Sequence, residues 1–173
     1  MKKITSLLFI VPLLLTHSYV ANAQQFGTVQ FHGYIVSQTC TVNDGAPDLS
    51  VTLPTVPATS LDTLGKTAGR TEFNINLSEC DEDLNEIAVS FEVGPNTNLV
   101  ANRLINRGTA SNVEVQILDS DSNPVKLNGS APTKYTPVFN GSAQIKYYAE
   151  YYAAGSASSG TVETSTRYTV VYP

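Results

Sequence analysis

Apolar and polar side chains alternate with a period of two along much of this chain, and this pattern limits the possible folds more than any other feature. In one segment, Val113, Val115 and Ile117 alternate with Glu114 and Gln116. A strand with one face on a core and the other in solvent has this period, and no segment has the apolar spacing of a long helix. The same alternation runs through residues 29–35, 73–77, 87–93, 143–151 and 168–172. The pattern predicts an all-β protein.

Turn-forming residues separate these segments. The turns are rich in Gly, Pro, Asn and Ser and lie at residues 43–45, 94–96, 122–124, 128–130, 140–142 and 155–160. Short strands joined by such turns are typical of a sandwich or a small barrel. Residues 59–69 leave room for one helical turn. No linker and no internal repeat divides the chain, which favours one domain.

The first 23 residues have the pattern of a signal peptide. Lys2 and Lys3 precede an apolar stretch, residues 4–15, and Ala21-Asn22-Ala23 is a small-x-small cleavage site. Pro12 interrupts the apolar stretch, which is also shorter than the roughly 20 residues of a membrane-spanning helix. We therefore expect an exported chain that begins near Gln24 and has 173 − 23 = 150 residues.

The composition argues against a nucleic-acid partner. Charged residues make up 14% of the chain, and without Lys2 and Lys3 the formal balance is 8 − 15 = −7. An acidic chain without a basic run lacks the electrostatic footprint that binds phosphate backbones.

Two cysteines, Cys40 and Cys80, lie in the exported part. An even number of cysteines in an exported protein is typical of a disulfide. A metal pair or a redox pair is the competing interpretation, but His32 is the only histidine after the leader and there is no C-x-x-C. A four-ligand zinc site would then need carboxylates. The sequence predicts a structural disulfide.

The segment from Gln24 to Val36 is an alternating apolar strand at an end that cleavage would leave free. Its apolar face includes Gly33, where a missing side chain weakens a strand but permits close approach to another surface. Two interpretations remain open: the segment is the first strand of the same sandwich, or it is an extension that binds elsewhere.

Several motifs give the chain a specific resemblance. In order they are GTVQFHG (27–33), CTV (40–42), FNINLSEC (73–80), NVEVQILD (112–119), YYAAG (151–155) and YTVVY (168–172). Together they are similar to the major subunits of type 1 fimbriae, which are pilins of the chaperone–usher pathway. The similarity covers nearly the whole exported chain.

The resemblance implies an incomplete immunoglobulin-like sandwich that a donor strand from a neighbouring subunit completes. It implies three parts: signal peptide 1–23, N-terminal donor-strand extension 24–36, and pilin domain 37–173. By position, Val29, Phe31, Gly33 and Ile35 match the donor strand, and Cys40 with Cys80 match the family disulfide. The closing strand beside the groove matches Tyr168, Val170 and Tyr172.

The resemblance also implies partners and a location. We expect identical or related pilin subunits in a head-to-tail filament, a periplasmic chaperone and an outer-membrane usher, with export through the periplasm to a surface fimbria. A host or surface receptor is a further candidate partner. The last residue, Pro173, cannot donate a ladder hydrogen bond, so the chaperone contact is less securely implied than polymerisation.

Catalytic, cofactor and metal sites are not predicted. The chain has no G-x-S-x-G, no H-E-x-x-H and no phosphate-binding glycine loop. Asp119-x-Asp121-x-Asn123 begins like a calcium loop, but Pro124 and Ser130 replace the required Gly and Glu, which favours a hairpin turn.

Two tyrosines, Tyr148 and Tyr152, are expected on the outer face of their strand. Such rings stack on sugars or pack between subunits, and a filament favours packing. Taken together, the resemblance implies a major structural subunit that polymerises by donor-strand exchange, with a minor or adaptor subunit as the first alternative. A single-domain glycan-binding adhesin is the second, although a tip adhesin usually has an additional receptor domain.

Overall fold

The computed structural model describes residues 27–31, 33, 40–132 and 134–173. The chain divides into two compact units, residues 1–34 and 35–173, and every strand that the structure describes lies in the second. The predicted signal peptide and Ile35 lie outside the described residues.

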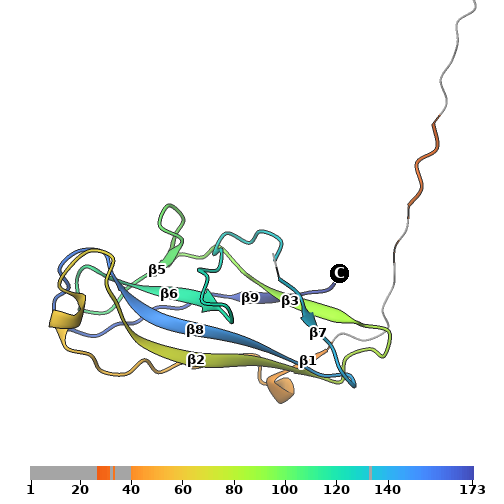
Figure 1. The fold of residues 1–173 in the computed structure, drawn as a ribbon, viewed down its shortest axis with the longest axis horizontal. Helices are drawn as coiled ribbons and strands as arrows, with labels where there is room; N and C mark the ends of the chain where they lie inside the picture. Colours follow the sequence, from red (N-terminus) through yellow and green to blue (C-terminus); the bar gives the residue numbers. More distant parts are fainter. Residues whose placement is uncertain (1–26, 32, 34–39, 133) are drawn as a thin grey trace, which may run out of the picture. The chain divides into compact units, whose positions relative to one another are not determined.

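Two antiparallel sheets form the second unit (Figure 1). The larger sheet has the order β1 (Thr41–Val42), β2 (Thr67–Ser78), β8 (Ala143–Ala153), β6 (Val113–Asp119), β5 (Arg103–Ile105) and β4 (Thr97–Asn98). The smaller sheet has the order β7 (Thr136–Pro137), β3 (Glu86–Phe91) and β9 (Tyr168–Val171). The all-β prediction is confirmed, and the architecture is a sandwich.

The period-two pattern places one face of each long strand in the core. β2 and β8 pair in a register that puts Ile75 opposite Ile145 and Phe73 opposite Tyr147, while Ile117 of β6 lies opposite Ala149. A one-residue slip would turn all of these side chains to the other face, so burial fixes the register. The prediction for residues 87–93 was wrong at its end, because β3 stops at Phe91 and Val93 is exposed before the Gly94-Pro95 turn.

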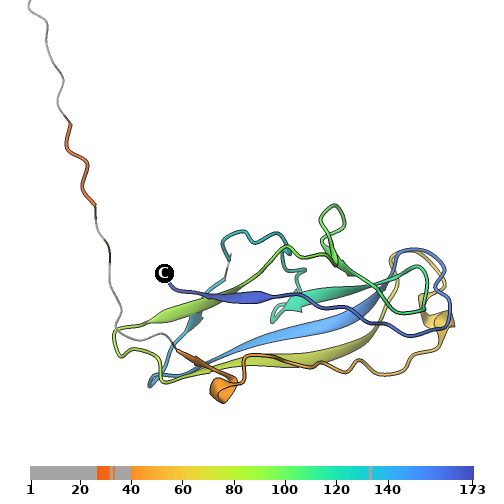
Figure 2. The same cartoon turned by 180° about the vertical axis from the view of Figure 1, so that it is seen from behind.

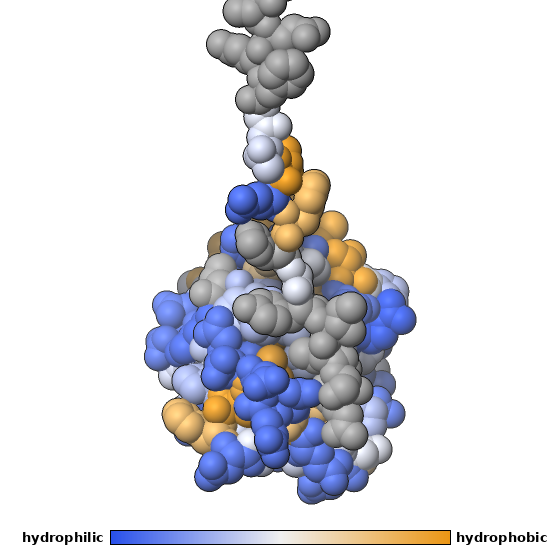
Figure 3. All heavy atoms as spheres, turned by 90° about the vertical axis from the view of Figure 1, so that its right-hand side faces the viewer, coloured by the Kyte–Doolittle hydropathy of each residue, from blue (hydrophilic) through white to orange (hydrophobic). Residues whose placement is uncertain are grey.

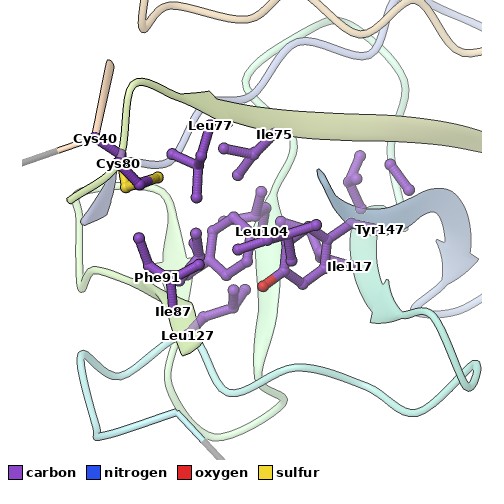
Figure 4. Packing of buried hydrophobic residues seen from close by; sticks show 14 of the residues in the cluster. Cys40, Ile75, Leu77, Cys80, Ile87, Phe91, Leu104, Ile117, Leu127 and Tyr147 are labelled. Atoms are coloured by element: carbon purple, nitrogen blue, oxygen red, sulfur yellow. A yellow bond between two sulfur atoms is a disulfide. The ribbon is translucent and has the colours of Figure 1, made fainter. Parts of the chain in front are cut away.

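The core lies between the two sheets (Figure 4). The Tyr147 ring meets Phe91 edge-on at 5.1 Å and stacks on Phe73 at 5.6 Å, as measured between ring centroids. Burial, with a smaller contribution from Asp119, raises the pKa of Tyr147 to about 12. Leu127, which lies in a connection between strands, is fully buried against the same cluster. The core therefore contains a loop residue in addition to the apolar strand residues that the alternation predicts.

A disulfide joins Cys40 to Cys80. Cys40 precedes β1, Cys80 follows β2, and both sulfur atoms lie at the edge of the core (Figure 4). The bond closes a loop over a sequence separation of 40 and anchors the chain directly after the predicted extension.

Helical structure is limited to two short 3-10 turns, η1 (Asn43–Gly45) and η2 (Ala58–Leu61), among the described residues. The second overlaps the start of the region where one helical turn was expected. Nowhere in the described part of the chain does a helix have the length and apolar character needed to cross a bilayer.

Candidate functional site

The C-terminal segment of the chain forms one wall of an open groove. From Thr161 to Val170 the odd-numbered residues are exposed and the even-numbered ones are partly buried. The five even-numbered side chains line the groove: Val162, Thr164, Thr166, Tyr168 and Val170. Only the end of this wall, β9, belongs to a sheet, and within the described residues it pairs with β3 alone. The other edge of β9 is therefore open (Figure 2).

Hydrogen bonds fix this wall from its outer side. The N–H groups of Arg107 and Ala110 donate to the carbonyls of Glu163 and Thr161 at 2.7 and 3.0 Å. Gly108 lies so close to the wall that a Cβ atom there would approach the Thr161 carbonyl oxygen to 2.2 Å. These contacts hold residues 161–167 extended although they form no regular strand.

The hydrogen-bonding direction of β9 alternates along the strand. The Glu92 N–H donates to the Arg167 carbonyl at 2.9 Å, and in an antiparallel ladder every second residue bonds to the same neighbour. Arg167, Thr169 and Val171 therefore bond toward β3. The backbone groups of Tyr168 and Val170 point to the open edge, where they can pair with another strand.

The opposite wall is residues 47–53, called the strap from here on. Its residues Pro47, Asp48, Leu49, Val51, Thr52 and Leu53 line the groove. Leu49 is 42% exposed and Val51 37%, which is unusual for apolar side chains beside a core. Among the described residues, no backbone hydrogen bond joins residues 48–53 to either sheet. The strap and the open edge of β9 therefore both have backbone groups without a ladder partner among the described residues.

Core side chains form the floor. Ile75, Phe91, Ile117 and Ala149 line a space of about 1030 Å³ that opens between the two walls. The same residues belong to the central apolar cluster, so the groove reaches the core from outside. A concave groove with an apolar floor is a candidate binding site.

The structure places the predicted site residues in three groups. Tyr168 and Val170 line the groove, whereas Tyr172 packs against the core and its hydroxyl accepts a 3.1 Å hydrogen bond from the Cys40 N–H. Val29 and Phe31 are 73% and 90% exposed, and Gly33 is exposed as well. None of the described residues of this segment, 27–31 and 33, is in a strand.

Two parts of the groove were not predicted from the sequence. Residues 161–167 read T-V-E-T-S-T-R, which has too few apolar positions for a two-residue pattern. The strap carries a signal that could have been used, since Leu49, Val51 and Leu53 alternate between two prolines, Pro47 and Pro54.

The outer face of the larger sheet is a separate polar surface. Tyr148 and Tyr152 lie there and are half-buried, with the Arg103 guanidinium 3.6 Å above the Tyr152 ring centre. Arg103 Nε also contacts Glu114 at 2.7 Å, and Arg70 Nε contacts Glu150 at 2.9 Å. These groups already have partners within the domain. At the end that carries β1 and β7, the surface is largely hydrophilic, with small apolar patches (Figure 3).

Metal ligands do not gather in the part of the chain that the structure describes: no three His, Cys, Asp or Glu side chains lie close enough to share an ion. Residues 119–123 form a turn in which Asp119 accepts hydrogen bonds from the N–H groups of Asp121 and Asn123.

Comparison with protein families matches residues 29–172 to the model of the family described as fimbrial protein. The chain is 39% identical to the major fimbrial subunit SMF-1 of Stenotrophomonas maltophilia, over 88% of this chain and 95% of that protein. It is 35% identical to the type-1 fimbrial protein, A chain, of Escherichia coli K12, over 84% of this chain and 83% of that protein.

Solved structures share the fold. A chain from a chaperone–usher pilus structure superimposes with a TM-score of 0.66 at 17% identity, over 91% of this chain and all of that one. The P pilus rod subunit PapA gives a TM-score of 0.63 at 15% identity, over 78% of this chain and 99% of that one.

Proposed function

This chain belongs to the fimbrial protein family and is a structural subunit of a surface fimbria, and we propose that it polymerises by lending its N-terminal extension to the groove of the next subunit. The observation that carries the proposal is the groove itself. One wall has an open strand edge at Tyr168 and Val170, and side chains of the core line the floor.

The extension has the complementary properties. Val29 and Phe31 are exposed apolar side chains on one face of an alternating segment. Strand addition would pair the backbone of residues 28–35 with the free edge of β9, and the alternating side chains would fill the groove. The strap could pair with the other edge of the incoming strand. Val29, Phe31, Gly33 and Ile35 are the residues that we assign to the groove side.

The geometry of this contact leads to a filament. Donor and acceptor are different surfaces of one chain, so the contact is heterologous and does not close into a dimer. Each added subunit presents a new extension or a new groove. The apolar groove of a lone subunit is also an aggregation hazard, which is why we propose a periplasmic chaperone and an outer-membrane usher as partners.

We assign the chain to the shaft of the fimbria as a major subunit. A major and a minor or adaptor subunit would share the groove and the extension, so their sites do not separate them. The copy number of the chain along isolated filaments tests this assignment: many copies in series support it, and one or a few per filament contradict it.

Gly33 tests the register of the lent strand. A Cβ atom at Gly33 has nothing within 4 Å in this structure, so Gly33→Leu should leave the free subunit unchanged. In the filament we expect the added side chain to overpack a shallow part of the groove and to destabilise the contact by about 1 to 3 kcal/mol. Filaments heated in detergent should then lose their ladder of multimers at a lower temperature.

The control is Thr28→Leu, which adds a comparable side chain on the opposite face of the segment. It should leave the multimer ladder unchanged. If space existed beside Gly33, the leucine would instead stabilise the filament by roughly 1.5 to 3 kcal/mol. Equal or greater heat stability of Gly33→Leu filaments would show that the groove is not shallow at this position.

A further inference from the structure

One side chain connects the two walls of the groove. Tyr168 extends from β9 toward the strap, where its hydroxyl donates a hydrogen bond to the Pro47 carbonyl. The same hydroxyl accepts a hydrogen bond from Asn43 Nδ2 at 3.5 Å. Among the described residues, no other hydrogen bond joins the strap to the C-terminal wall.

Asn43 is itself anchored to the larger sheet. Its side-chain oxygen accepts a 2.9 Å hydrogen bond from the Asn76 N–H of β2. β1 ends at Val42, which lies opposite Leu77 of β2. The Asn43 side chain therefore bonds to the next residue along the edge of β2. Asn43 has φ 45° and Asp44 φ 53°, a left-handed turn that asparagine tolerates better than most residues. The turn directs the chain from β1 into the strap.

Leu53 packs against the core at one end of the strap, but the strap has few other contacts that fix its position. Its backbone lacks ladder bonds to either sheet, and Leu49 and Val51 are partly in solvent. A wall without a ladder can move toward or away from β9. At the Pro47 end of the strap, the separation of the two walls therefore depends on the contacts among Asn43, Pro47 and Tyr168, which we call the clasp.

We infer that the clasp holds the strap at the separation that an incoming strand requires, so that Tyr168 and Asn43 are positioning residues for strand binding. The inference rests on the proposed function. A groove held open in the bound geometry loses less conformational freedom on binding than one that must first be ordered. Burial, together with nearby Asp48, raises the pKa of Tyr168.

The experiment measures strand binding by the acceptor groove alone. The full exported chain carries Phe31→Asp in every variant, so that its own extension is a poor competitor, and the probe is a fluorescent peptide of residues 24–36. Tyr168→Phe keeps the ring and removes the hydroxyl. Asn43→Gly keeps the left-handed turn and removes the amide. Each should weaken peptide binding about fivefold, the effect of losing a neutral hydrogen bond.

Hydrogen exchange of the strap amides, residues 48–53, gives a second readout without peptide. These amides should exchange faster in Tyr168→Phe, while the amides of β2 and β8 stay as protected as in the parent. Tyr152→Phe is the matched control, because it removes a tyrosine hydroxyl from the outer face of the sheet. It should change neither peptide binding nor strap exchange.

Peptide binding by the parent and by Tyr168→Phe tests the clasp and the proposed function separately. If the parent binds the peptide and Tyr168→Phe binds it as tightly or more tightly, the clasp is overturned and strand addition stands. If the parent does not bind the peptide at all, the proposed function is overturned and the clasp with it.

Discussion

Removing residues 24–35 should stop the growth of filaments built from this subunit alone. The truncated chain keeps both sheets, the disulfide and the groove, since all of these lie after residue 35. It can accept a strand but has none to lend, so each contact ends the polymer. Electron microscopy of the assembled material should show no long filaments, while intact subunits under the same conditions form them.

Two full-length double variants test whether filament growth needs the apolar face of this segment and not only its length. Val29→Asp with Phe31→Asp places two charges on the face assigned to the groove, and an unpaired buried charge is strongly unfavourable. Thr28→Asp with Gln30→Asp places the same charges on the opposite face. The first pair should abolish filaments and the second should permit them. Long filaments from the truncated chain would show that the segment is not the lent strand.

Loss of the disulfide should produce the largest change in stability of the subunit itself. In the chain-entropy model, closing a loop over a separation of 40 residues stabilises the folded state by about 4 kcal/mol. Both cysteines are also buried in the core, and Cys40 is the described residue that anchors the chain after the extension. We expect Cys40→Ser with Cys80→Ser to lower the free energy of unfolding by about 2 to 5 kcal/mol.

Denaturant unfolding of the monomer, with its groove filled by the peptide of residues 24–36, measures this difference. The reduced parent should unfold at nearly the same denaturant concentration as the double variant, which controls for the change of side chain. Peptide mapping without reductant should recover Cys40 joined to Cys80. Free thiols in the exported protein, or equal stability of the oxidised parent and the double variant, would contradict the structural role of the bond.

The long strands could be predicted because their sequence pattern and their environment agree. In β8, in residues 73–78 of β2 and in residues 113–117 of β6, apolar residues on the core face alternate with polar residues or tyrosine. Leu118 of β6 breaks this alternation and is buried on the opposite face. The predicted end of β3 was wrong because the apolar alternation continues to Val93, beyond the end of the strand. Val93 lies at a turn, where backbone geometry outweighs side-chain preference. β1, β4 and β7 have two residues each and β5 has three, too few to show a period.

The groove was predictable on one side only. Tyr168 and Val170 follow the apolar alternation, and the structure places both in the groove wall. The rest of that wall is rich in threonine and serine, since its inward side chains meet an open groove instead of a packed core. The clasp was not predictable, because it depends on the distance between β9 and a turn that lies more than a hundred residues earlier in the sequence.

Hydrogen exchange of individual backbone amides on β9 tests the central claim most directly. In the lone subunit the Tyr168 and Val170 amides face the open edge and should exchange rapidly, whereas Thr169 and Val171 bond toward β3 and should be protected. In filaments the lent strand should protect Tyr168 and Val170 to the level of their neighbours. Tyr168 and Val170 amides that exchange as fast in filaments as in the lone subunit would contradict strand addition at this edge.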